Sequence, residues 1–159
     1  MRKLLFAIGV ALLSGSASAA PPPRPKLILA LSVDQFSAEL FQRYRSTYRA
    51  GLRTLSRGIA YPIAYQTHAA TETCPGHASI LSGRYPSGTG IVSNNWYDRA
   101  TGKDVYCVSV PGQPDPKARG PQNIRVSSLG DWIRQAQPAA RVFAVSGKDR
   151  AAIGMAGHH

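Results

Sequence analysis

The spacing of apolar residues in the first half of the chain predicts strands and helices in alternation. Residues 26–33 are a nearly continuous apolar run, which is typical of a strand buried on both faces of a parallel sheet. Between Ser37 and Ser56 apolar residues recur every three or four positions, which predicts a helix in two pieces that break around 47–51. Alternation over residues 59–65 predicts a second strand, at a sheet edge or strand end because of Pro62.

The second half of the chain predicts shorter elements. Strand, helix and strand in succession favour the α/β class, but only about three strands are convincing, which suits either a minimal domain or an incomplete sequence. The expected elements are a helix with Pro75 in its first turn that ends at Gly83, a loop over 84–90, a hairpin over 95–110 around Ala100-Thr101-Gly102, a loop over 111–121, a helix over 129–136, a buried strand over 141–145 and a turn over 148–150.

The first 19 residues have the three parts of a Sec-type signal peptide. Met1-Arg2-Lys3 is basic, residues 4–13 are apolar, and Ala17-Ser18-Ala19 fits a small-residue cleavage site. A membrane anchor is disfavoured, because about ten strongly apolar residues are too few for a hydrocarbon core that needs about 20. Residues 20–25 form a proline-rich spacer. We therefore expect a periplasmic or secreted protein with no stable membrane anchor, folded over 26–159.

Composition adds a strong positive charge to this picture. The 159 residues are 43% hydrophobic and 17% charged, which excludes a disordered chain or a coiled coil. The formal net charge is +11, and removing Arg2 and Lys3 leaves 17 basic against 8 acidic residues, or +9. This charge predicts attraction to phosphorylated small molecules, nucleic acid or an anionic membrane surface. Specific nucleic-acid binding is disfavoured, because the basic residues are scattered and no nucleic-acid-reading motif is present.

Several residues are candidates for chemistry. Asp34 follows the first predicted strand, where open α/β sheets place ligand sites, although aspartate also caps helices. Thr73 heads a predicted helix, whose free N–H groups favour negative charge, although a simple N-cap is the commoner role there. Cys74 is a rival nucleophile without an identifiable base, since His68 and His77 could equally be surface residues.

Several known catalytic motifs are absent from the sequence, and the number of cysteines limits the possible disulfides and zinc sites. Ser79 does not lie in a G-x-S-x-G motif, and the sequence has no Walker loop and no G-x-G-x-x-G fingerprint, which disfavours those hydrolase and nucleotide-binding types. Two cysteines, Cys74 and Cys107, are too few for a disulfide-rich miniprotein or a four-cysteine zinc site. Export would permit one bridge between them, but the sequence does not say whether they meet.

Five short segments, taken in order, resemble the alkaline phosphatase superfamily. The resemblance is to bacterial alkaline phosphatases with a threonine nucleophile, which are similar to the nucleotide pyrophosphatase/phosphodiesterases, and it covers most of residues 26–157. Five motifs in order are far more specific than any one of them. The segments are Val33-Asp34-Gln35, Thr71-Glu72-Thr73-Cys74-Pro75-Gly76-His77, Leu81-Ser82-Gly83-Arg84-Tyr85-Pro86, the run GIVSNNWYD over 90–98, and Lys148-Asp149-Arg150.

The resemblance implies a three-layer α/β/α sandwich with a mostly parallel sheet, and a phosphomonoester hydrolase with a phosphothreonine intermediate. Thr73 would be the nucleophile, with its oxygen on a zinc ion that Asp34 also binds. Asn94 would donate a side-chain N–H to a phosphoryl oxygen. Lys148 and Arg150 would bind the other phosphoryl oxygens, whereas without the resemblance they would read as a solvated basic turn.

The sequence also departs from the family pattern. A complete site holds two zinc ions with further Asp and His ligands later in a much longer chain, and here only Asp34 and Thr73 match a ligand position, since His158 and His159 fit no ligand motif. We therefore expect an N-terminal portion, inactive alone, of an enzyme that acts on small phosphate esters. A phosphodiesterase or nucleotide pyrophosphatase of the same superfamily and a non-catalytic periplasmic anion-binding module are the alternatives. The oligomeric state stays open.

Overall fold

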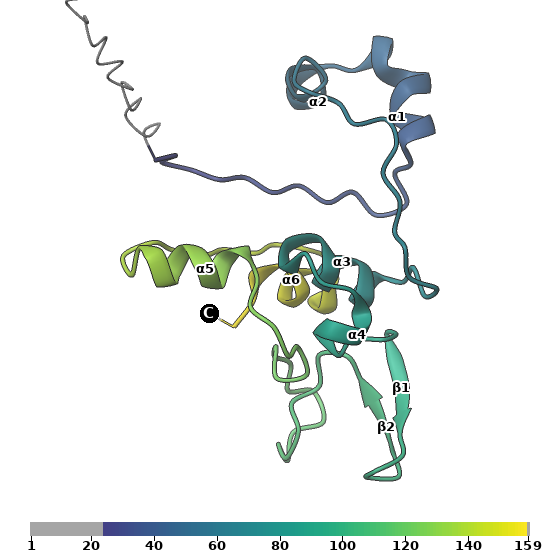
Figure 1. Ribbon diagram of the computed structural model, residues 1–159, viewed down its shortest axis with the longest axis vertical. Coiled ribbons are helices and arrows are strands. Elements are labelled where there is room, and N and C mark those ends of the chain that lie inside the picture. Colours follow the sequence, from purple (N-terminus) through teal and green to yellow (C-terminus); the bar gives the residue numbers. More distant parts are fainter. Residues whose placement is uncertain (1–23, 159) are drawn as a thin grey trace, which may run out of the picture. The chain divides into compact units, whose positions relative to one another are not determined.

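The computed structural model describes residues 24–158 (Figure 1). They belong to two units, one that ends at Leu31 and one that begins at Ser32. The predicted signal peptide over 1–19 and residues 20–23 of the predicted spacer lie outside the described residues. Within residues 24–158, no helix has both the length and the apolar character needed to span a bilayer.

The helices of the second unit follow the predicted pattern closely. The region from Ser37 to Ser56 forms two α-helices joined by a 3-10 turn, and the Ser37 side chain caps the first of them by accepting from the Leu40 N–H at 3.1 Å. Gly83 ends α3 with a φ of +63°, as expected of a glycine C-cap. The helices are α1 (Ala38–Tyr44), η1 (Arg45–Thr47), α2 (Ala50–Leu55), α3 (Thr73–Ser82), α4 (Pro86–Thr89), α5 (Leu129–Ala136) and α6 (Asp149–Ala156).

The predicted hairpin is present. Strand β1 (Asn95–Asp98) pairs antiparallel with β2 (Lys103–Tyr106). At the turn, the Asp98 carboxylate accepts hydrogen bonds from the Ala100 N–H at 3.0 Å and from the Thr101 hydroxyl at 2.7 Å. Local turn chemistry of this kind is encoded by neighbouring residues, which explains why the sequence predicts it well.

Three other predicted strands are not paired in the structure. Residues 26–33, 59–65 and 141–145 form no β-ladder, and the sheet of the described residues consists of β1 and β2. Most of their apolar side chains are exposed, with 85% of Ile59 and 97% of Val145 accessible. The prediction of paired, buried strands at these positions is therefore wrong for the described chain. Apolar sequence favours an extended backbone, but pairing and burial also require a neighbouring strand.

Two smaller predictions also need correction. The loop expected over 84–90 contains the short helix α4, which starts at Pro86 and is closed by Gly90 with a φ of +79°. The turn expected over 148–150 is the start of α6, with Lys148 as its N-cap residue. Proline and glycine are typical of loops, but Pro86 also suits the first turn of a helix and Gly90 its C-cap.

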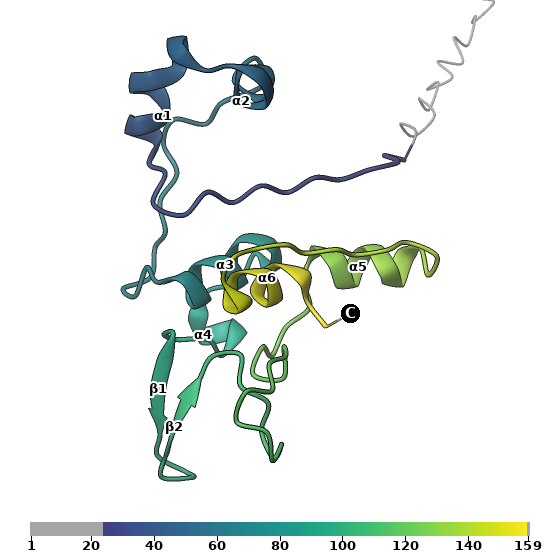
Figure 2. The same ribbon diagram turned by 180° about the vertical axis from the view of Figure 1, so that it is seen from behind.

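The core of the second unit lies around the start of α3. Helices α3 and α6 run side by side in both views (Figures 1 and 2), and Gly154 allows their close approach, because a Cβ there would lie 3.3 Å from the Ala78 nitrogen. Cys74 and Cys107 form a disulfide with their Cα atoms 6.4 Å apart. The bridge that export would permit is therefore present, and it ties the first turn of α3 to the residue after β2.

Candidate functional site

Thr73 is the first residue of α3 and is almost buried, with 9% of its surface exposed. The N-cap position is taken by Glu72, so Thr73 does not have the simple capping role that the sequence left open. Its carbonyl oxygen contacts Nδ1 of His77 at 2.8 Å. The first turn of a helix carries unpaired N–H groups and the positive end of the helix dipole, so an anion near Thr73 is favoured.

Asn94 is hydrogen-bonded directly to this helix start. Its Oδ1 accepts from the Cys74 N–H at 2.9 Å, and its own backbone N–H donates to the Glu72 carboxylate at 2.6 Å. The Ser93 hydroxyl donates to the same Glu72 oxygen at 2.8 Å. These bonds lower the pKa of Glu72, the Asn94 N–H contributing most. Because Oδ1 is engaged, the Asn94 Nδ2 is the group left to meet a ligand near Thr73.

Asp34 and Lys148 form an ion pair although they are far apart in sequence. The Lys148 Nζ lies 2.7 Å from the Asp34 carboxylate, and both side chains are about half exposed. The hydrogen bond from Lys148 is the main reason that the pKa of Asp34 is lowered. Asp34 is therefore ionised at neutral pH, as a metal ligand or a charge partner must be.

Arg150 lies in the first turn of α6. Its Nη1 donates to the Tyr106 hydroxyl at 3.2 Å, while its Nε is buried and has no hydrogen-bond partner among the described residues. The charge of Arg150 also lowers the pKa of Glu72, the N-cap residue of α3. A buried donor without a partner is costly unless a ligand satisfies it, so Arg150 does not behave as part of a solvated turn.

The structure removes Cys74 as a competing nucleophile. Its sulfur is in the disulfide with Cys107, and no free cysteine is present among residues 24–158. His77 is buried and its ring contacts the Thr73 carbonyl and, at 3.3 Å, the Ser32 hydroxyl. His68 contacts the Gln66 side chain at 3.0 Å.

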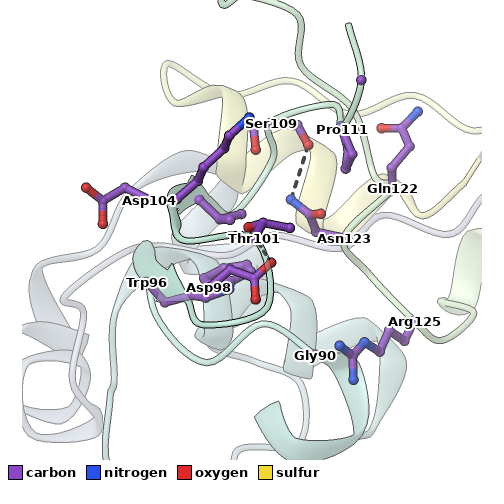
Figure 3. A pocket seen from close by; sticks show the side chains of 13 residues that line it. Gly90, Trp96, Asp98, Thr101, Asp104, Ser109, Pro111, Gln122, Asn123 and Arg125 are labelled. Carbon is purple, nitrogen blue, oxygen red and sulfur yellow. Dashed lines mark hydrogen bonds between the residues drawn. The ribbon is translucent and has the colours of Figure 1, made fainter.

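Among the described residues, cavities lie beside Asp34 and beside the hairpin. One of about 360 Å³ is lined by residues that include Asp34, Glu72 and His77. A larger one, of about 510 Å³, lies between the hairpin and the following loops (Figure 3) and contains none of the five residues that the sequence singles out. There Asn123 donates to carbonyl groups, including that of Ser109 at 3.1 Å, so it is engaged in holding the loop.

The described residues do not by themselves form a zinc site. Among residues 24–158, no three His, Cys, Asp or Glu side chains are grouped so that they could hold a metal ion. The Asp34 carboxylate is instead held by Lys148. Asp34 and the Thr73 hydroxyl offer oxygen ligands of the right kind, but a protein zinc ion requires three or four.

Sequence reasoning missed three residues that contact the candidate site residues. Glu72 holds Asn94, and it lies inside the motif that pointed to Thr73, so a signal for it was available. Tyr106 contacts Arg150, and Asp149 contacts Tyr106. Asp149 lies inside the motif Lys148-Asp149-Arg150, but these contacts join segments more than 40 residues apart, which local sequence does not indicate.

Comparisons with known proteins identify the family of this chain. The family described as type I phosphodiesterase / nucleotide pyrophosphatase matches residues 28–156. Alkaline phosphatase PhoD of Zymomonas mobilis is 50% identical over 139 residues, which are 84% of this chain and 24% of PhoD. The chain thus spans about a quarter of the length of this curated relative.

Solved structures give the same result. The crystal structure of wild-type alkaline phosphatase PafA matches with a TM-score of 0.79 at 35% identity, over 87% of this chain and 29% of PafA. A PafA variant in which one threonine, one asparagine, one lysine and one arginine are substituted matches with a TM-score of 0.77 at 32% identity, over the same shares. These matches confirm the predicted alkaline-phosphatase-like α/β fold class, of which the described residues form a part.

Proposed function

Because this chain belongs to the type I phosphodiesterase / nucleotide pyrophosphatase family, we propose that it is the N-terminal part of an exported alkaline phosphatase. The enzyme would hydrolyse small phosphate monoesters through a phosphothreonine at Thr73. The observation that carries this proposal is the bond from the Cys74 N–H to the Asn94 Oδ1, which holds an amide donor beside Thr73 at the start of α3. The similarity to alkaline phosphatases PhoD and PafA supports the reaction class.

The pattern of the four proposed site residues gives separate support. In the PafA variant, the substituted threonine and asparagine are 21 positions apart, and the lysine and arginine are two apart. Thr73 and Asn94 have the first separation in this chain, and Lys148 and Arg150 have the second. Because residue types, order and both spacings agree, we treat these four side chains as one set.

In the proposed reaction, the Thr73 hydroxyl gives up its proton to water and its oxygen attacks the phosphorus of the ester. The new O–P bond forms as the ester P–O bond breaks, and the leaving alkoxide takes a proton from water. Water then attacks the phosphothreonine, which releases inorganic phosphate and returns the Thr73 hydroxyl. The N–H groups at the start of α3 and the Asn94 Nδ2 would donate to the phosphoryl oxygens as negative charge moves onto them.

Lys148 and Arg150 would supply the positive charge of the site. The buried Nε of Arg150 has no partner within residues 24–158, and a phosphoryl oxygen there would satisfy it. The Lys148 ammonium has three donors, so it can keep its bond to Asp34 and still contact a phosphoryl oxygen. We place the monoester first because the similar proteins PhoD and PafA are alkaline phosphatases.

The proposed enzyme also binds zinc. Asp34, with its lowered pKa, is a suitable carboxylate ligand, and the Thr73 oxygen would be a second. Zinc, when bound, would act as a Lewis acid that makes the threonine oxygen a better nucleophile. The remaining ligands would have to come from residues outside 24–158.

Turnover of p-nitrophenyl phosphate by the full-length protein tests this function. Thr73→Ala should lower kcat by about 10³-fold or more, because it removes the attacking oxygen. The matched control is Thr54→Ala, which removes an exposed threonine of α2 and should stay within about twofold. A chelator should abolish turnover and added zinc should restore it. Wild-type turnover by Thr73→Ala would refute the proposal.

The alternatives give different results in the same assay. The family description favours a diesterase as the second candidate, and faster turnover of bis-p-nitrophenyl phosphate than of the monoester would establish it. Binding of phosphate without turnover of either ester would identify an anion-binding module. The proposed export is tested separately, because the mature protein should begin directly after Ala19.

A further inference from the structure

The Tyr106 hydroxyl lies between Arg150 and Asp149. It accepts a hydrogen bond from the Arg150 Nη1 at 3.2 Å and donates one to the Asp149 Oδ1 at 2.7 Å. Arg119 completes the group, since its Nε lies 3.1 Å from the Asp149 Oδ2 and its guanidinium lies 5.0 Å from the centroid of the Tyr106 ring. Tyr106 is therefore held on both its ring and its hydroxyl.

This arrangement restricts how Arg150 can turn. One end of its guanidinium is fixed at Nη1 by Tyr106, while the buried Nε has no partner among the described residues. A planar guanidinium that is fixed at one nitrogen presents its other edge in a defined direction. The edge that carries Nε is thus the one left without a hydrogen-bond partner among the described residues.

We propose that Tyr106 and Asp149 are positioning residues, which hold Arg150 so that its Nε edge faces the phosphoryl group. This inference rests on the proposed function and names residues outside its catalytic set. Neither Tyr106 nor Asp149 needs to touch the substrate, because each acts through Arg150.

The protonation states agree with these hydrogen bonds. Burial and the bond to Asp149 raise the pKa of Tyr106, so the phenol keeps the proton that it donates. Burial opposes ionisation of Asp149, but hydrogen bonds from the Tyr106 hydroxyl, the Arg150 N–H and Arg119 outweigh it and lower the pKa of Asp149. With Tyr106 neutral and Asp149 ionised, the Tyr106 hydroxyl can donate to Asp149 while it accepts from Arg150.

The covalent structure links this group to the nucleophile. Tyr106 is the last residue of β2 and directly precedes Cys107, whose disulfide partner Cys74 directly follows Thr73. The tyrosine that orients Arg150 is therefore tethered to the first turn of α3.

Tyr106→Phe in the full-length enzyme tests the proposal, because it removes the hydroxyl and keeps the ring. We expect about a tenfold loss in kcat/KM for p-nitrophenyl phosphate and a similar rise in the inhibition constant of inorganic phosphate, as for loss of one hydrogen bond to a charged group. Tyr97→Phe is the matched control, since Tyr97 is an exposed tyrosine of the same hairpin, and it should leave both constants unchanged.

A double-mutant cycle with Arg150→Ala separates positioning from a structural role. If Tyr106 acts through Arg150, adding Tyr106→Phe to Arg150→Ala causes no further loss of activity. Equal losses in the two backgrounds, or no loss in the wild-type background, would overturn the proposal. If the wild-type enzyme turns over no phosphate ester, the proposed function itself fails, which is a different outcome.

Asp149→Asn is a second variant, which is also compared in the wild-type and Arg150→Ala backgrounds. The amide oxygen can still accept from Tyr106, so the loss should be smaller than for Tyr106→Phe and should also vanish in the Arg150→Ala background. A larger loss of kcat/KM that persists in the Arg150→Ala background would contradict the proposal that Asp149 acts on Arg150 through Tyr106.

Discussion

The side-chain oxygen of Asn94 accepts a hydrogen bond from the backbone N–H of Cys74 at 2.9 Å, next to Thr73 in the first turn of α3. An asparagine that follows Thr73 by 21 positions is thus fixed at the start of a helix. Because the Cys74 N–H is a donor, the amide atom of Asn94 that faces it is Oδ1. It uses the acceptor of Asn94 on the protein and leaves the donor for a ligand.

Substitution of Asn94 should separate its two roles. Asn94→Asp keeps an oxygen that can accept from Cys74 but replaces the donor with a negative charge, so folding should be retained and kcat/KM for a phosphate monoester should fall by about 10²-fold or more. Asn94→Ala loses both groups, and it should be less stable than Asn94→Asp but more active. Kinetics and thermal unfolding of the two variants check this order, and equal activity of Asn94→Asp and wild type would contradict it.

The disulfide between Cys74 and Cys107 should contribute strongly to stability. It closes a loop with a sequence separation of 33, for which the loss of unfolded-state entropy is worth about 3–4 kcal/mol. Reduction, or the double change of Cys74 and Cys107 to serine, should lower the free energy of unfolding by about that amount in denaturant titrations. Two free thiols in the folded, unreduced protein would contradict the structure.

Stability should fall in acid because of Asp131. Burial raises the pKa of Asp131, but hydrogen bonds from the N–H groups of Ser128 at 2.7 Å and His158 at 2.9 Å outweigh it, so its pKa is lowered. A lowered folded-state pKa adds stability above the unfolded value of about 3.9, and this stability is lost as the pH falls through the folded-state pKa. The free energy of unfolding should therefore decline below about pH 5.

The variant Asp131→Asn tests that origin. It should be less stable than wild type near neutral pH, and its unfolding free energy should decline less steeply in acid, because the titrating group is gone. Asp104→Asn, a change at an exposed position of β2, is the control and should keep the wild-type pH profile. Identical slopes for wild type and Asp131→Asn would show that other groups carry the acid sensitivity.

Local signals in the sequence predicted the local structure well. The bounds of α5, the break between α1 and α2 and the hairpin all follow from capping residues, turn residues and periodicity within a few positions. The segments 26–33, 59–65 and 141–145 illustrate the limit. Their sequences favour strands, but a strand is completed by a partner that local pattern does not supply.

In the candidate site too, the sequence identifies individual residues but not the contacts between distant segments. Thr73, Asn94, Lys148 and Arg150 stand in motifs that resemble a family, so sequence could single them out. The pairing of Asp34 with Lys148 and the support of Arg150 by Tyr106 join residues 114 and 44 positions apart, and only the folded chain reveals them. Glu72 lies between these cases, because it stands in one of the motifs, whereas its bond to Asn94 is seen only in the structure.

The most direct test of the central claim is to locate the phosphate on the enzyme during turnover. The full-length protein is mixed with excess p-nitrophenyl phosphate, quenched in acid within one turnover, digested and mapped by mass spectrometry. We predict a single phosphorylated residue, Thr73, and none in the Thr73→Ala variant. A phosphate on Ser79 or another residue, or a burst of p-nitrophenol that leaves no phosphorylated threonine, would contradict the account.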